Sequence, residues 1–253
     1  MCLLVPQHIS YRSAVDHAPS VACTGPLGGP PRPTRTFAAG GACVSTYRAA
    51  PAHVWASTML DLLVLEQVSP LAAARIFAGG AVAMYEAALP GMPGRRRLTG
   101  TVGGLDAAPS AEARRGLDWP AAVSVGAYTV LVELLALQAP GAAPLLRATF
   151  DWQLLARRSS RSADHVVAAS LRWGEQVGAA VVEWARADAE AAPGGPGAPS
   201  RQSAAAVTRQ LQTTAASLES QDLRLDQALE AYAVYALAVH ASLRSGNPLP
   251  RAA

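Results

Sequence analysis

Two opposite charges, Arg75 and Glu86, lie within an otherwise apolar stretch, "SPLAAARIFAGGAVAMYEAALPG", at residues 69–91. A guanidinium in such a place could hold an anion, and a carboxylate could transfer a proton. In a helix the two side chains point within about 20° of each other, but they lie roughly 16 Å apart along the axis. They cannot pair with each other, so each needs a partner on another element, because an unpaired buried charge is very costly. We predict that both are structural charge anchors between helices. A ligand-facing role is the alternative.

The same stretch also predicts which features its neighbours must have. Carboxylates elsewhere in the chain are the candidate partners of Arg75, and these are Asp61, Glu66, Asp118 and Glu183. The pair Gly79-Gly80 lowers helix propensity by about 1 kcal/mol per glycine, so we expect another helix to cross there at close range. Both faces of this helix are apolar, which is typical of a helix buried on all sides.

Three consecutive arginines, Arg95, Arg96 and Arg97, precede the Gly-rich segment "LTGTVGG". Guanidinium and backbone N–H groups together can bind an anion, so these residues are weak candidates for an anion-binding loop. An exposed basic loop without a ligand is the alternative. The sequence contains no lysine, and all 21 of its Lys and Arg positions are arginine. A Schiff base, a lysine general base and a lysine phosphate clamp are therefore excluded within this sequence.

The histidines and cysteines form no metal-binding or catalytic motif. The histidines are His8, His17, His53, His165 and His240. None stands at the spacing of a metal site, and no GxSxG, Walker or GxGxxG motif is present. We expect a surface or capping role for His165 and a core-edge position for His240. The cysteines, Cys2, Cys23 and Cys43, predict neither a disulfide framework nor a zinc site. No catalytic, cofactor-binding or metal-binding residue can be named from these patterns.

Charge and hydropathy limit the partners. A net charge of +3 with scattered arginines does not favour nucleic acid as a partner. The most apolar stretch, residues 120–139, contains Glu133 and is bounded by prolines, so a buried helix is favoured over a membrane span. The start, "MCLLVPQHIS", has no basic segment and meets Pro6 early, which does not fit a signal peptide. A soluble protein is expected, and its compartment is not indicated.

Helical periodicity positions these residues from His53 onward. Helices are predicted over residues 53–68, 70–90, 119–137, 142–156, 163–190, 204–218 and 222–243. Ser69 is an expected N-cap with Pro70 as the first helical residue, and Ser160 or Ser162 is expected to cap the fifth helix. That helix carries the most regular apolar stripe, and its members are Val166, Ser170, Trp173, Val177, Val181 and Trp184.

No segment alternates with the period of two that is typical of a strand, so the expected fold class is all-α. We predict a helical bundle of about six to seven helices with a disordered N-terminal tail. Residues 1–50 form the tail and residues 51–190 the bundle. Residues 191–203 are a Pro/Gly linker, and residues 204–245 are C-terminal helices that pack on the bundle.

The order of several short motifs resembles the vanadium-dependent haloperoxidase family, relatives of the type 2 phosphatidic acid phosphatases. The matching segments are "AARIFA", "MYEAALPG", "RLTGTVGGL", "LDWPAAVSVGAYTVLVELL", "ASLRWGEQVGAAVVEWARAD" and "LRLDQALEAYAVYALAVHASL". They resemble the N-terminal helices of that family in the same order and cover roughly residues 54–243. The resemblance implies an all-helical fold and kinship with a vanadate- or phosphate-binding enzyme.

The family's active-site residues have no counterpart here. In the family, vanadate or phosphate is bound by a lysine, an "RP" arginine, a Ser-Gly-His segment and a final arginine and histidine. This sequence has no lysine and no Ser-Gly-His, and "RSGNPLPRAA" at residues 244–253 has "PR" in place of "RP". No catalytic residue carries over, and no cofactor is expected for this chain, although the intact family binds vanadate.

The expected function follows from that departure. The chain is expected to be a truncated or degenerate vanadium-haloperoxidase or acid-phosphatase-like protein that is inactive alone. Its partner would be a missing C-terminal half or a helical protein. A non-catalytic helical scaffold or partner-binding module, with an exposed apolar face as its binding surface, is the alternative. A small membrane-associated helical protein is a further alternative.

Overall fold

The computed structural model describes residues 42–98, 105, 116–136, 138–158, 162–191 and 203–251. These residues form seven α-helices and three short 3-10 helices, and the fold is all-α as predicted. The α-helices are α1 (Ala50–Leu65), α2 (Pro70–Ala88), α3 (Trp119–Leu135), α4 (Ala143–Arg158), α5 (Asp164–Glu190), α6 (Ala204–Glu219) and α7 (Leu225–Ser245). The 3-10 helices are η1 (Val44–Thr46), η2 (Leu89–Gly91) and η3 (Pro140–Ala142). Most of the expected tail and linker lies outside the described residues.

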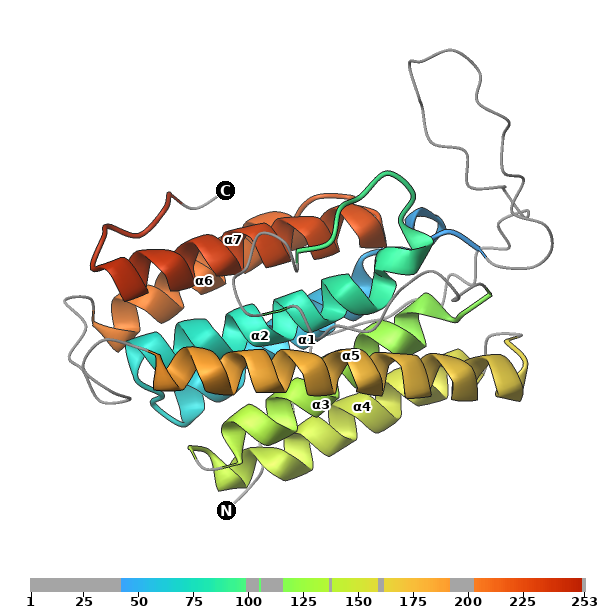
Figure 1. Cartoon of the computed structure of the whole chain (residues 1–253), viewed down its shortest axis with the longest axis horizontal. Coiled ribbons are helices and arrows are strands. Elements are labelled where there is room, and N and C mark those ends of the chain that lie inside the picture. The colour runs from blue at the N-terminus through green and yellow to red at the C-terminus, as the bar shows by residue number, and fades with distance from the viewer. Residues whose placement is uncertain are drawn as a thin grey trace, which may run out of the picture.

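Helix α2 is the central helix of the bundle. It contacts α1, α3, α5, α6 and α7, so it lies between the α3–α4 layer and the α6–α7 layer (Figure 1). Every residue of α2 from Ala72 to Ala88 is buried, as its two apolar faces predicted. The charges Arg75 and Glu86 therefore lie inside the protein.

The predicted cap agrees with the structure at Ser69 and differs for the fifth helix. Ser69 is the N-cap of α2 with Pro70 as its first residue, although the Ser69 side chain makes no cap hydrogen bond. Asp118 caps α3 by accepting a hydrogen bond from the Ala121 backbone N–H at 3.1 Å. The prediction for α5 is wrong for Ser162, because Ala163 is the N-cap and the Ser162 hydroxyl donates to Asp118 instead. Ser160 lies outside the described residues.

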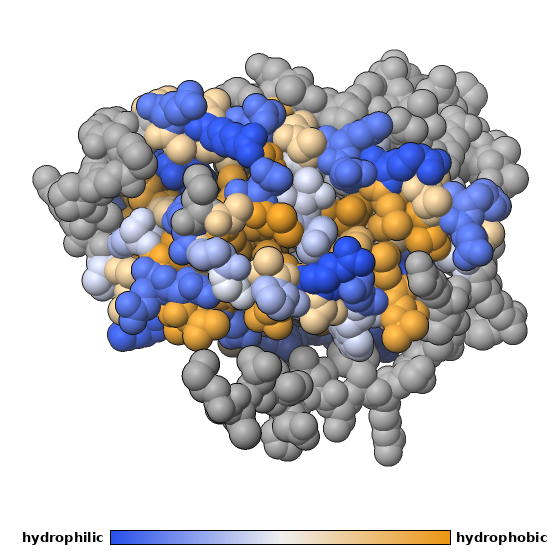
Figure 2. Space-filling view, turned by 90° about the horizontal axis from the view of Figure 1, so that it is seen from below, coloured by the Kyte–Doolittle hydropathy of each residue, from blue (hydrophilic) through white to orange (hydrophobic). Residues whose placement is uncertain are grey.

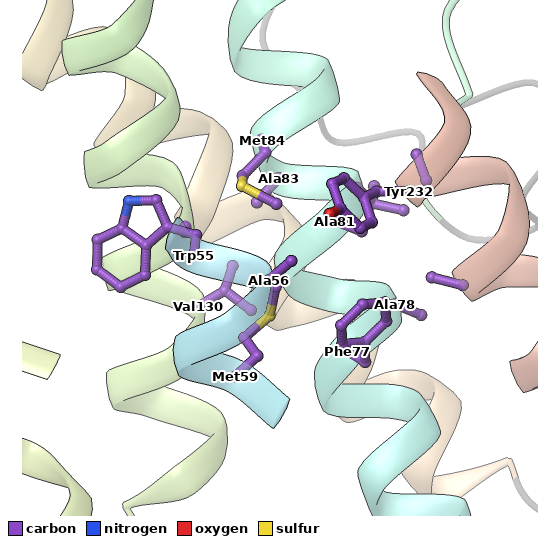
Figure 3. Close-up of a cluster of buried hydrophobic side chains, with 14 of the residues drawn as sticks. Trp55, Ala56, Met59, Phe77, Ala78, Ala81, Ala83, Met84, Val130 and Tyr232 are labelled. Atoms are coloured by element: carbon purple, nitrogen blue, oxygen red, sulfur yellow. The ribbon is translucent and has the colours of Figure 1, made fainter. Parts of the chain in front are cut away.

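The core around α2 is closely packed, as Gly79 and Gly80 predicted. A Cβ atom on Gly80 would lie 2.4 Å from Met59 Sδ of α1, and one on Gly79 would lie 3.2 Å from the Val130 side chain of α3. Figure 3 shows Met59 between α1 and α2, with Phe77 and Tyr232 on the opposite side of α2 toward α7. The glycines therefore let two helices approach α2 from different sides.

Glycines also bring α3 and α5 together. A Cβ on Gly174 would lie 2.3 Å from the Ala122 carbonyl oxygen of α3, and a Cβ on Gly178 would lie 3.1 Å from the Gly126 carbonyl oxygen. The two backbones are thus in contact over two turns of α5. Because the nearest obstacle at Gly174 is a backbone carbonyl oxygen, a side chain there could be accommodated only by moving the helices apart.

The expected boundary of the tail at residue 50 lies too late in the chain. Val44 is fully buried, and the Tyr47 carbonyl accepts a hydrogen bond from the Leu225 backbone N–H at 3.0 Å. The Trp119 indole N–H donates to the Ala42 carbonyl at 2.6 Å. Cys43 is disulfide-bonded, which the cysteine pattern did not predict. Residues 42–49 therefore belong to the folded domain.

The surface alternates between apolar and polar side chains. The face on the side of α3 and α4 carries several separate apolar patches divided by hydrophilic residues (Figure 2). The large apolar side chains with the highest exposure are Val64, Leu65, Leu145, Trp152, Leu155 and Val234. Among the described residues, no helix combines the length and the hydropathy needed to span a bilayer.

Candidate functional site

The carboxylate of Asp188, near the C-terminal end of α5, is the centre of a buried charge cluster. Its Oδ2 accepts from Arg75 Nε of α2 at 3.1 Å and lies 3.0 Å from His240 Nε2 of α7. Its Oδ1 accepts from Arg244 Nη1, one turn beyond His240. Because an ionised carboxylate only accepts hydrogen bonds, His240 Nε2 must carry the hydrogen. Asp188 thus joins three helices.

The neighbours of this cluster fix its orientation. Arg75, Asp188 and His240 are all buried, with 8%, 7% and 5% of their surface exposed. The Trp184 ring, one turn before Asp188, contacts the His240 ring edge to face at 6.0 Å. Arg244 also reaches the Ala191 carbonyl at the end of α5. Arg75 Nη2 is buried and has no hydrogen-bond partner within the described part of the chain.

The cluster keeps Asp188 ionised. Burial alone would raise the pKa of Asp188, but the hydrogen bond from His240 and the guanidinium groups of Arg75 and Arg244 outweigh it and lower the pKa to about 2. A carboxylate with such a low pKa and with both oxygens accepting hydrogen bonds is a poor general base. The cluster is suited to holding helices together.

This low pKa predicts a specific dependence of stability on pH. A depressed pKa stabilises the folded state above the unfolded value of 3.8, and that contribution is lost as the pH falls through about 2. We expect the difference in unfolding free energy between the wild type and Asp188→Asn to shrink by about 2 kcal/mol between pH 6 and pH 2. Urea unfolding at a series of pH values measures it. If the difference in unfolding free energy between the two proteins stays constant from pH 6 to pH 2, the pKa of Asp188 is not lowered in the folded state.

Glu86, the second charge of α2, holds the loop that follows the helix. Its Oε1 accepts from the Leu98 backbone N–H at 2.7 Å, and its side chain is buried. The neighbouring Tyr85 hydroxyl donates to the Arg96 carbonyl at 2.8 Å. Burial, together with the charges of Glu230 and Glu86, raises the pKa of Tyr85 to about 12, so the phenol is a hydrogen-bond donor at neutral pH.

The three arginines of this loop lie together above α7. Arg95 Nη1 forms an ion pair with Glu230 Oε2 at 2.5 Å. Arg95, Arg96 and Arg97 line a half-open pocket of about 280 Å³, together with Tyr85, Gly94, Leu98, Glu230 and Val234. The structure therefore brings the predicted loop candidates to one pocket.

Arg75 joins two helices, but its partner was predicted wrongly, and Glu86 holds the loop that follows α2 where an anchor between helices was predicted. The partner of Arg75 is Asp188, which is none of the four candidates. Asp118 is instead bound by Arg157, whose Nε and Nη2 approach its two oxygens at 2.9 to 3.1 Å. Glu183 pairs with Arg186 at 3.1 Å on the surface of α5.

Sequence reasoning also missed Asp188 and Arg244. A signal for both was present, because Asp188 continues the buried stripe of α5 one turn after Trp184. Arg244 likewise follows His240 by one turn on α7. A charge that continues a buried stripe indicates an internal partner.

Among the described histidines, His165 lies at the surface as predicted, whereas His240 lies deeper than the core edge predicted for it. His165 is exposed at the start of α5, and His240 is buried in the charge cluster. His53 Nδ1 lies 2.8 Å from the Tyr232 hydroxyl, and burial lowers the pKa of His53. Among the described residues, no group of three or more His, Cys, Asp or Glu side chains could hold a metal ion.

Comparisons with protein families, with curated proteins and with solved structures find no match to this chain. The resemblance to the haloperoxidases therefore depends on the sequence motifs. Three of these motifs meet in the charge cluster: "AARIFA" contributes Arg75, "VVEWARAD" contributes Asp188, and "ALAVHASL" contributes His240.

Proposed function

We propose that this chain is a degenerate relative of the vanadium-dependent haloperoxidases whose helices form a scaffold and which performs no vanadate or phosphate chemistry alone. The sequence supports this proposal because the family's lysine and Ser-Gly-His segment have no counterpart in it. The convergence of three motif segments on Asp188 supports the kinship, since motifs that resemble a family are expected to meet where that family packs its helices.

The observation that carries the proposal is that an internal carboxylate already lies between the basic groups of the cluster. Arg75 Nε and His240 Nε2 both reach Asp188 Oδ2, and Arg244 reaches Oδ1. A vanadate or phosphate oxyanion placed against these groups would have to approach the ionised Asp188, which repels it. The residues present therefore do not fit vanadate.

A halogenation assay tests the proposal. Purified full-length protein with orthovanadate, bromide and hydrogen peroxide is expected to brominate monochlorodimedone no faster than vanadate with heat-denatured protein. Hydrolysis of p-nitrophenyl phosphate is likewise expected at the rate of the denatured control. Either reaction at several times that rate would overturn the proposal, because it would require an oxyanion site formed by other residues of this chain.

A partner-binding module is the second candidate, and exposed apolar side chains favour it. Val64 and Leu65 at the end of α1 are 51% and 71% exposed. Side chains of this size at one helix end are suited to an apolar surface on another helix. The partner would be a helical protein or a segment encoded outside this chain, such as a C-terminal half. Sequencing the DNA that follows codon 253 distinguishes the two sources.

A further inference from the structure

We propose that the pocket between residues 94–98 and α7 binds a monocarboxylate with a small apolar body. The chain that follows α2 turns back over α7, and its residues line the pocket together with Glu230 and Val234 of that helix (Figure 1). The site is separate from the Asp188 cluster and carries no chemistry of the proposed function. The fixed backbone of the loop, the guanidinium of Arg96 and the apolar wall of the pocket each support the proposal.

The loop is held from below by two buried residues. The Tyr85 hydroxyl donates to the Arg96 carbonyl at 2.8 Å, and Glu86 Oε1 accepts from the Leu98 N–H at 2.7 Å. Only 3% of Tyr85 and 2% of Glu86 is exposed. Gly94 turns the chain with a φ of +84°, which glycine adopts without strain. The two hydrogen bonds fix the backbone on both sides of Arg96, and a fixed backbone reduces the entropy lost on binding a ligand.

An ion pair joins the loop to the helix on the other side of the pocket. Arg95 Nη1 lies 2.5 Å from Glu230 Oε2, and both residues line the pocket. Because the two charges cancel, this pair adds no net charge to the lining. The pair connects the two walls, so the pocket is formed before a ligand enters it, as is usual for small-molecule sites.

The guanidinium of Arg96 is the group that would bind the carboxylate. Arg96 is exposed, lines the pocket and makes no ion pair or side-chain hydrogen bond in the described part of the chain. Arg97 is engaged in an interaction of its own, so no second guanidinium is assigned to the ligand. A guanidinium and a carboxylate form paired, charge-assisted hydrogen bonds. One available positive charge fits a monocarboxylate better than a phosphate monoester, which carries nearly two negative charges at neutral pH.

The size and the lining of the pocket fit a small ligand with an apolar part. The pocket has a volume of about 280 Å³, near the lower end of the range for small-molecule sites, which is roughly 300 Å³. Leu98 is half-buried and Val234 is 56% exposed, and both add apolar surface to the lining that contains Arg96. A carboxylate at Arg96, with a ring or a short alkyl chain against Leu98 and Val234, would use both parts of the lining.

Titration calorimetry at pH 7 with phenylacetate and with phenylacetamide tests the proposal. The amide has nearly the shape of the carboxylate but no charge, so the difference between their affinities measures the contribution of the charge. We expect phenylacetate to bind about tenfold more tightly than phenylacetamide. Arg96→Gln is expected to weaken phenylacetate binding about tenfold, because a charge-assisted pair is lost, and to leave phenylacetamide binding nearly unchanged.

Two further variants separate the charge from the apolar wall. Arg209→Gln is the matched control for Arg96→Gln, since Arg209 is exposed on α6 and does not line the pocket. It should change the affinity for phenylacetate by less than about twofold. Val234→Thr keeps the shape of the side chain but adds a hydroxyl to the apolar wall, and it is expected to weaken phenylacetate binding about threefold. Circular dichroism confirms that the variants keep their helices.

Three outcomes would overturn the proposal. The first is the absence of saturable phenylacetate binding, and the second is equal binding of phenylacetate by the wild type and by Arg96→Gln. The third is tighter binding of phenyl phosphate than of phenylacetate, because the pocket would then supply more than one positive charge to its ligand. Since the readout is binding, each of these outcomes leaves the halogenation assay unaffected.

Discussion

Replacing Asp188 by alanine is expected to lower the free energy of unfolding by about 3–5 kcal/mol, the usual cost of removing one partner of a buried charge pair. The loss is large because the basic partners of Asp188 remain buried in the variant. Arg75, His240 and Arg244 all direct a donor at this carboxylate. Without it, two guanidinium groups and an imidazole would face one another with no anion between them. Urea unfolding at pH 7 measures the loss.

A surface aspartate provides the matched control for that experiment. Asp151 pairs with Arg147 at 2.9 Å within α4, and more than half of each side chain is exposed. Asp151→Ala is expected to change the unfolding free energy by no more than about 0.5 kcal/mol. A loss of similar size in the two variants would mean that the Asp188 cluster contributes no more than an exposed ion pair, which contradicts its assigned role.

The second large effect is expected for Gly174→Ala, with a loss of about 2–3 kcal/mol in the free energy of unfolding. In isolation, alanine favours a helix over glycine by about 1 kcal/mol, so the substitution would otherwise stabilise α5. The new Cβ would lie 2.3 Å from the Ala122 carbonyl oxygen and 2.4 Å from Val125 Cγ1. A backbone carbonyl cannot rotate away as a side chain can, so α3 and α5 must separate.

Gly79→Ala is the matched control, because Gly79 also lies inside a buried helix. Its new Cβ would meet the Leu134 and Val130 side chains at 3.2 Å, and these can shift slightly. The gain in helix propensity should offset most of that cost, leaving a change within about 1 kcal/mol. Thermal unfolding of the two variants side by side tests the difference. Equal losses would show that close packing at Gly174 is not limited by the α3 backbone.

The helices could be predicted because local patterns determine them. Apolar residues at helical spacing predicted nearly the observed bounds of α2 and α3, and Ser69-Pro70 marked the start of α2. The close approach of other helices to α2 could be predicted because Gly79-Gly80 is also a local signal. Such signals lie within one turn or two of the element that they describe.

The ion pairs could not be predicted because they depend on how distant helices pack. Arg75 and Asp188 are 113 residues apart, and which carboxylate meets Arg75 follows from the crossing of α2 and α5. The same holds for Glu86, whose partner Leu98 is reached by a turn of irregular backbone. The burial of these charges was predictable from their apolar surroundings, but their partners were not.

The structure gives the arginine triplet a defined position. Its sequence indicated either an anion-binding loop or an exposed basic loop. The three arginines line one pocket, and the Tyr85 and Glu86 hydrogen bonds hold the backbone that carries them. The basic groups of the Asp188 cluster, in contrast, direct donors at an internal carboxylate.

The central claim is that the charge within the family-like motif of α2 is an anchor for Asp188. A double-mutant cycle tests it most directly, using Arg75→Met, which keeps the volume of the stem, and Asp188→Asn, which keeps the shape of the carboxylate. Unfolding free energies of the wild type, both single variants and the double variant give the coupling. We expect a coupling of about 2 kcal/mol or more, with the double variant losing less than the sum of the single losses. Losses that add to within about 0.5 kcal/mol would contradict it, because Arg75 would then act independently of Asp188.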